Sequence, residues 1–272
     1  MKASQLCAAL RRRGRELLAT IICVLVLCTA ASAERKPLQT ILDLAAANVT
    51  AFLDTISDVN CTEHVTQEKI GDNGKTMEKR ESDFDYIVLL SNAGGELTLS
   101  ESRVAADSNK EHKEKSPLLV SNGFSMLLLI FHPYYSAGFQ FSFEPGQNDP
   151  IGEVTQIHFQ HIPGTRSPAA LALRGREYPL DISGTAWIDT RTGVIDKITV
   201  RIGNEMEDIG LHALLGEIEY APVSFQTAPG TYWLPAHATV EVQSRHQHWR
   251  NTHVFSAYKR FSVKTKEQVS QP

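Results

Sequence analysis

Residues 184–202 read GTAWIDTRTGVIDKITVRI and carry the clearest structural signal in the chain. Apolar and polar residues alternate on both sides of the central TRTG segment, which is typical of two half-buried β-strands. Gly193 tolerates a positive φ, as a hairpin with a bulge requires. The stretch therefore predicts a β-hairpin with one apolar and one polar face. The apolar face consists of Ala186, Ile188, Val194, Ile198 and Val200.

The same period-two alternation continues through most of the chain. The predicted strands are 63–70, 84–90, 97–103, 139–143, 154–161, 169–173, 185–189, 195–202, 216–223, 236–246 and 253–263. Short connections rich in Gly, Pro and Asn indicate antiparallel pairing. A sheet of this width must curl, close or split to protect its edges. We therefore expect an α+β fold built on a strongly curved antiparallel sheet, a half-barrel of about ten or eleven strands.

Two segments have helical rather than strand-like periodicity. Apolar residues recur at intervals of three and four through 38–56, which predicts an N-terminal helix that packs on the sheet. Residues 123–131 are apolar all round and end before Pro133, which predicts a short buried helix. We expect residues 34–272 to form a single domain, with a flexible, charged loop near 105–116.

The N-terminal segment has the features of a secretory signal peptide. Arginines at positions 11, 12, 13 and 15 precede an apolar run over 19–27, and small residues follow at 31–33. This is the pattern that export machinery recognises. An uncleaved membrane anchor would need a longer apolar run. We expect cleavage near Ala33, a protein exported to the periplasm or the extracellular space, and no integral membrane span after processing.

Removal of residues 1–33 would make the protein acidic. It takes five basic and one acidic side chain from the 27 and 31 of the whole chain, which leaves 22 and 30 and a net charge of −8. Phosphate binding needs a basic patch, so this balance argues against nucleic acid as a partner. Only Cys61 remains of the four cysteines, so no internal disulfide can form. We expect Cys61 to be a small buried strand residue rather than a nucleophile.

Apolar side chains share single faces of several predicted strands. They alternate with polar residues through 84–90, 139–143 and 238–242. Such faces must meet something apolar, either helices in a packed core or a ligand in a hollow, and both readings stay open. The residues expected to line a hollow are Phe84, Tyr86, Val88, Leu99, Arg103, Leu128, Phe131, Phe139, Phe141, Phe143, Ile188, Ile198, Val200, Val240 and Val242.

The order of these elements resembles that of the outer-membrane lipoprotein-sorting carriers of the bacterial envelope. The resemblance extends over 84–263, and two motifs carry it: the G-x-A-x-I-D…T-G-x-I pattern that begins at Gly184, and the later Tyr232-Trp233-Leu234-Pro235. In that family an incomplete barrel holds helices against its concave side, and the apolar hollow between them shields acyl chains. The resemblance implies the same fold and a lipid-like or hydrophobic ligand, but it transfers no functional residue.

Glu101 and Arg103 continue the apolar face that Leu97 and Leu99 begin. Charged groups at the end of an apolar face lie at its exposed rim, or inside if they are paired and hydrogen-bonded. We expect the rim. In the inner alternative, Arg103 would contact the headgroup of a ligand.

Three histidines near the C-terminus are weak candidates for a metal site. His246 and His248 share a face of a predicted strand, and His253 lies just beyond the predicted turn. Histidine nitrogens are common ligands of transition metals, but no HExxH or cysteine signature accompanies them. We therefore expect solvated histidines at a hairpin end, with no metal and no cofactor.

Together these observations favour an exported protein of the cell envelope that binds a hydrophobic or lipid-like ligand on the concave face of a curved sheet, as a lipid or lipoprotein carrier or sensor. The sequence has no G-x-S-x-G elbow and no glycine-rich phosphate loop, so we expect no enzyme. Two alternatives stay open. One is a non-catalytic interaction module that binds an envelope protein, and the other is a metal-dependent hydrolase that uses the 246–253 hairpin.

Overall fold

A computed structural model provides the structure of the protein. It describes residues 36–93, 96–105, 123–145, 153–173, 176–204, 206–207, 210–226 and 228–261. The chain divides into two compact units, Met1–Ile41 and Leu42–Pro272, and the whole sheet belongs to the second. The predicted signal peptide, residues 1–33, and residues 106–116 of the predicted flexible loop lie outside the described residues.

Ten strands form one open antiparallel sheet, which confirms the predicted curved α+β architecture. Their order is β3-β2-β1-β12-β11-β10-β9-β8-β5-β4. The strands are β1 (Val59–Ile70), β2 (Thr76–Ala93), β3 (Glu96–Ala105), β4 (Phe139–Phe143), β5 (Val154–His161), β8 (Ile182–Asp189), β9 (Ile195–Ile202), β10 (Leu211–Phe225), β11 (Ala228–Ser244) and β12 (His248–Arg260). β6 (Ala170–Leu173) and β7 (Arg176–Pro179) form a separate small hairpin.

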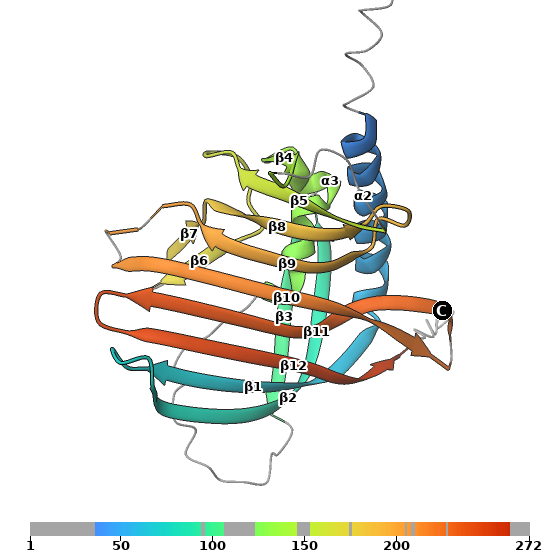
Figure 1. Ribbon diagram of the computed structural model, residues 1–272. Helices are drawn as coiled ribbons and strands as arrows, with labels where there is room; N and C mark the ends of the chain where they lie inside the picture. Colours follow the sequence, from blue (N-terminus) through green and yellow to red (C-terminus); the bar gives the residue numbers. More distant parts are fainter. Residues whose placement is uncertain are drawn as a thin grey trace, which may run out of the picture. The chain divides into compact units, whose positions relative to one another are not determined.

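Within the described residues, three helical segments accompany the sheet. They are α2 (Lys36–Ile56), the 3-10 helix η1 (Phe124–Phe131) and the single-turn α3 (Pro133–Ser136). In Figure 1, β5 and β8–β12 run across the view in one layer, while α2 and β3 run steeply across them behind that layer. The helices predicted over 38–56 and 123–131 are therefore present, and the second is a 3-10 helix.

The hairpin of β8 and β9 is the predicted one, with one shift in its register. Ala186, Ile188 and Ile198 are completely buried. A bulge lies where Trp187 pairs with Lys197 and Ile188 pairs with Ile195, so Ile195 rather than Val194 continues the inner face. A bulge adds one residue to one strand, so side chains before the bulge point to the opposite face from the one that simple alternation predicts.

The middle of the concave face is a packed core. The residues of η1 from Met126 to Phe131 are all buried. The Phe131 ring lies 5.3 Å from Phe141 and 6.3 Å from Phe159 between centroids, and Phe139 lies 6.1 Å from Phe159. These tilted and edge-on contacts are the arrangements that aromatic pairs favour. η1 therefore fills most of the hollow that the aromatic strand faces predict.

The last hairpin differs from the prediction. Its strands end at Ser244 and begin again at His248, whereas we expected strands 236–246 and 253–263. Cross-strand pairs such as Glu241 with Arg250 extend the sheet through a polar segment that resembles a turn when read alone. The Pro229-Gly230 pair lies at the start of β11 and not between two strands.

Candidate functional site

A pocket of about 300 Å³ opens between α2 and the concave face of the sheet. Its lining includes residues at the starts of β9 and β11, the ends of these strands that lie nearest α2 in Figure 1. Its lining residues are Asn48, Val49, Ala51, Phe52, Thr55, Leu128, Val194, Ile195, Tyr220, Thr231, Tyr232, Trp233 and Leu234. This volume is at the lower end of the range of about 300–1,000 Å³ that is usual for small-molecule sites.

The pocket wall is mainly apolar, and two of its polar side chains hydrogen-bond within the protein. The Tyr220 hydroxyl donates to the Ser125 carbonyl at 3.1 Å, and Thr55 Oγ1 donates to the Ala51 carbonyl at 3.1 Å. Burial raises the pKa of Tyr220 far above its ordinary value, so it stays neutral. None of the described residues that line the pocket has a charged side chain. The pocket therefore suits an uncharged, mainly apolar molecule.

The turn between β8 and β9 fixes the position of α2 along one wall. Gly193 has a φ of 74°, and a Cβ there would lie 2.3 Å from the carbonyl carbon of Leu44. Asn48 Nδ2 donates a hydrogen bond to the carbonyl oxygen of Thr192. Because glycine has no Cβ, the helix can approach the turn this closely and the turn can adopt a positive φ.

Asp189 organises the same turn. Its Oδ1 accepts hydrogen bonds from the Arg191 and Thr192 backbone N–H groups at 2.9 and 2.7 Å, and from Thr192 Oγ1 at 2.8 Å. Desolvation would raise the pKa of this carboxyl group, but these hydrogen bonds outweigh it and lower the pKa. The turn that contacts α2 is therefore held by its own polar residues.

Most of the predicted lining residues form the packed core instead of this pocket. Of the fifteen, only Leu128 lines it. Tyr86, Val88, Phe131, Phe139, Ile188, Ile198, Val200 and Val240 are buried, and Phe84, Phe141, Phe143 and Val242 are half-buried. The Leu99 side chain lies outside the described residues, and Arg103 belongs to a separate polar cluster.

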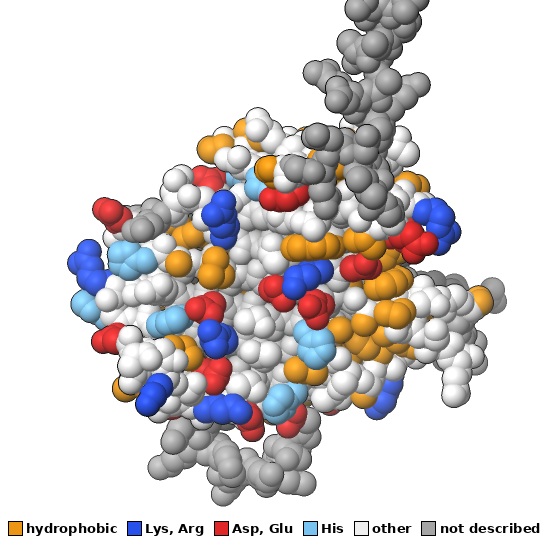
Figure 2. Space-filling view, viewed as in Figure 1, with side chains coloured by type: hydrophobic (Ala, Val, Ile, Leu, Met, Phe, Trp, Pro, Cys, Tyr) orange, Lys and Arg blue, Asp and Glu red, His pale blue; other side chains and the backbone are white. Residues whose placement is uncertain are grey.

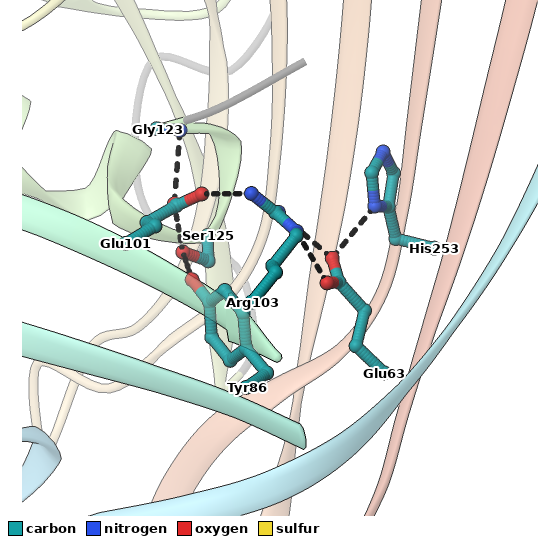
Figure 3. A network of polar contacts seen from close by, with 7 residues as sticks. All are labelled: Glu63, Tyr86, Glu101, Arg103, Gly123, Ser125 and His253. Atoms are coloured by element: carbon teal, nitrogen blue, oxygen red, sulfur yellow. Dashed lines mark hydrogen bonds and ion pairs between the residues drawn. The ribbon is translucent and has the colours of Figure 1, made fainter. Parts of the chain in front are cut away.

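That polar cluster is built around the Glu63 carboxylate of β1, which has no exposed surface (Figure 3). Arg103 of β3 donates to it through Nε at 2.5 Å and through Nη2 at 2.9 Å. His253 Nδ1 of β12 lies 2.8 Å from Glu63 Oε1. A bidentate arginine with a further hydrogen bond satisfies a buried carboxylate, which would otherwise be very unfavourable.

Glu101 extends the cluster to the start of η1. Its Oε1 accepts hydrogen bonds from the Gly123 N–H and from Ser125 Oγ, both at 2.9 Å, and the Tyr86 hydroxyl lies 2.6 Å from Ser125 Oγ. Its Oε2 lies 3.0 Å from Arg103 Nη1. The network therefore joins β1, β2, β3, β12 and η1, as Figure 3 shows.

The charges of the cluster keep one another ionised. Desolvation would raise the pKa of Glu63, but the hydrogen bonds from His253 and Arg103 outweigh it and lower the pKa. Desolvation would lower the pKa of Arg103, but Glu63 and Glu101 raise it above its ordinary value. Burial raises the pKa of Tyr86 well above its usual range, so the hydroxyl stays protonated.

This burial corrects the expected rim position of Glu101 and Arg103. Their side chains are only 5% and 19% exposed. Glu63 compensates Arg103, but it comes 40 residues earlier in the sequence, so its role was not visible from the strand that holds Arg103. The inner alternative is the observed one, with a protein carboxylate as the partner of Arg103.

The three candidate metal ligands do not come together. His246 lies in the turn between β11 and β12, His248 Nε2 lies 2.7 Å from Glu241 Oε1, and His253 Nδ1 contacts Glu63 Oε1. His248 and His253 are five residues apart in one strand, so their side chains point to opposite faces. No group of three possible metal ligands exists among the residues that the structure describes.

Two other side chains of reactive types, Cys61 and His161, have surroundings that suit a structural role. Cys61 is buried in β1, and desolvation raises its pKa to about 12, so the thiol stays protonated at neutral pH. His161 lies between an acid and a hydroxyl group: its Nδ1 is 2.8 Å from Asp181 Oδ1, and its Nε2 is 3.2 Å from Thr165 Oγ1. A catalytic triad has its acid, histidine and hydroxyl group in the same order. However, Thr165 Oγ1 also lies 2.6 Å from the Ile162 carbonyl oxygen and 3.1 Å from the Gly138 carbonyl oxygen, and both compete for its single proton. The arrangement ties the loop after β5 to β8.

The face seen in Figure 2 carries oppositely charged side chains close to one another. Lys197 pairs with Glu217 at 2.7 Å, and Arg250 pairs with Glu241 at 2.9 Å. Hydrophobic side chains gather on the right of this view, over the ends of β9–β12 that lie nearest α2 in Figure 1. The opposite charges within each of these two pairs compensate one another.

Sequence reasoning missed the residues that form most of the pocket. Tyr232 and Trp233 are part of the motif that carries the family resemblance, but no role was assigned to them. Phe52 belongs to the predicted helix face, and Tyr220 to a predicted strand. A pocket between them depends on how closely α2 approaches β10 and β11, which no local pattern reveals.

Comparison with models of known protein families gives no match, and no curated protein is significantly similar to the sequence. None of the helices that the structure describes is long and apolar enough to span a membrane.

Proposed function

We propose that this protein binds a small apolar molecule in the pocket between α2 and the sheet. The observation that carries the proposal is the pocket itself, a volume of about 300 Å³ with apolar walls on the concave side of the sheet. Removal of apolar ligand surface from water would supply the binding free energy. The volume suits one small molecule or a single chain better than a ligand with several acyl chains.

The protein's place in the cell is part of the same proposal. A protein exported by the N-terminal signal would meet envelope lipids and other apolar compounds. A pocket open to solvent would let it act as a carrier or sensor of such a compound. The resemblance to lipoprotein-sorting carriers supports a ligand of this general class.

A pocket-filling substitution tests the proposal. Ala51 of α2 lines the pocket and is exposed, so Ala51→Trp should fill the volume without disturbing the core. Ala47 is an exposed alanine of the same helix outside the lining, so Ala47→Trp is the matched control. We expect the wild type and Ala47→Trp to bind at least one neutral apolar probe, 1-dodecanol or N-phenyl-1-naphthylamine, with one-to-one stoichiometry in calorimetry. Ala51→Trp should lose that binding.

Equal binding by both tryptophan variants would place any apolar site elsewhere. If neither probe binds the wild type, and solvent extraction of the purified protein yields no apolar molecule, the proposal is wrong.

A second function has one specific observation in its favour. Leu89 and Val104 are 52% and 61% exposed and lie on the same face of the β2–β3 pair. Within the described residues β3 pairs only with β2, so its other edge can accept a strand. If an envelope protein pairs with this edge, Val104→Lys should weaken its binding. Cross-linking followed by recovery of partners measures this change, and equal recovery with the wild type and the variant would exclude binding at the β3 edge.

A further inference from the structure

The pocket walls contain four aromatic rings from three different elements. Phe52 comes from α2, Tyr220 from β10, and Tyr232 and Trp233 from β11. The rings of Phe52 and Tyr220 are 6.4 Å apart between centroids and meet edge-on at 84°. Rings on both the helix side and the sheet side can contact the faces and edges of a planar ligand.

The hydroxyl groups of the two tyrosines have partners inside the protein. Tyr220 donates to the Ser125 carbonyl, and Tyr232 donates to the Pro229 carbonyl at 3.2 Å. These tyrosines therefore offer mainly their rings to the pocket. The remaining polar side chains of the lining, Asn48, Thr55 and Thr231, are neutral.

A charged ligand group would have no counter-ion in the described lining. Arg260 Nη1 is near, at 3.2 Å from the Tyr232 hydroxyl, but Arg260 does not line the pocket. Moving a carboxylate into such surroundings without a partner is very unfavourable. An alkyl chain would be tolerated, but it would gain only from burial and not from ring–ring contacts.

From these observations we infer that the ligand is a neutral molecule built around a planar ring system, and not a fatty-acid anion. The inference rests on the proposed function and specifies the ligand class of the same pocket. The aromatic walls provide the preference for rings, and the lack of charge in the described lining provides the preference for neutrality.

Three probes of different chemistry separate these preferences. N-phenyl-1-naphthylamine is neutral and aromatic, 1-dodecanol is neutral and saturated, and dodecanoate is anionic and saturated. In calorimetric titrations of the full chain we expect the aromatic probe to bind about tenfold more tightly than 1-dodecanol, and dodecanoate to bind most weakly. Trp233→Leu should weaken binding of the aromatic probe about fivefold or more and leave binding of 1-dodecanol nearly unchanged. Phe52→Leu, which changes the opposite wall, should act in the same direction.

The outcomes distinguish this inference from the proposed function. If 1-dodecanol or dodecanoate binds as tightly as the aromatic probe, and neither leucine variant changes the ratio, the ring preference is wrong while a pocket for apolar ligands remains supported. If no probe binds the wild type, the inference is wrong together with the proposed function. If the wild type prefers the aromatic probe and both Trp233→Leu and Phe52→Leu keep that preference, the aromatic walls do not cause it and the inference is wrong.

Discussion

The concave side of the sheet has two regions of opposite chemistry. Under β1, β2, β3 and β12 lies the polar cluster of Glu63, Arg103, His253 and Glu101, in which each carboxylate is paired with Arg103. Under β9–β11 lie η1 and the uncharged pocket beside α2. Buried charges need close partners, and the groups of the polar cluster are partners of one another. Apolar walls have no such requirement, and an open volume remains there.

Ser125 connects the two regions. Its hydroxyl contacts Glu101 in the polar cluster, and its carbonyl accepts a hydrogen bond from Tyr220, whose ring lines the pocket. Nevertheless, the two regions are expected to serve different purposes. The polar cluster should determine stability, and the pocket should determine binding.

The largest expected effect is that of Arg103→Met. It leaves the buried carboxylates of Glu63 and Glu101 without their cation, which should lower the free energy of unfolding by about 3–5 kcal/mol. Urea denaturation measures this change. The double variant Glu63→Gln/Arg103→Met should recover part of the loss, because one unpaired charge is removed. A loss below about 1 kcal/mol in the single variant would contradict a structural role for the cluster.

A smaller effect is expected at the turn that supports the pocket. Gly193→Ala places a Cβ against Leu44 and Ala45, and Gly74→Ala is a matched control because Gly74 has a similar φ of 73° with no atom near the added Cβ. Gly193→Ala should therefore destabilise by about 1–3 kcal/mol more than Gly74→Ala, and it should also weaken ligand binding. Equal losses of stability would mean that α2 does not pack closely on this turn.

The smallest effect is a dependence of stability on pH. Because the pKa of Glu63 is lowered in the folded state, its stabilising contribution is present above about pH 4.5 and is lost as the pH falls through the folded-state pKa. One proton limits this contribution to about 1.4 kcal/mol per pH unit. Stability curves between pH 3 and 7 should therefore be flatter for Glu63→Gln than for the wild type. Parallel curves would contradict the assignment.

Much of the fold could be predicted because it depends on local patterns. Alternation predicted β4, β5 and β9 with their observed bounds, and Gly193 has the positive φ that its turn requires. The polar cluster could not be predicted, since Glu63, Arg103 and His253 come from three strands far apart in the sequence. The pocket was missed for a similar reason, because its walls meet only when α2 lies against β10 and β11.

Hydrogen–deuterium exchange with and without N-phenyl-1-naphthylamine tests most directly whether the pocket rather than the polar cluster binds the ligand. Binding in the pocket should slow exchange in residues 48–55 and 231–234 and cause no change in the strand segments that hold Glu63, Arg103 and His253. Protection centred on those strands, with no change along α2 and the start of β11, would contradict it.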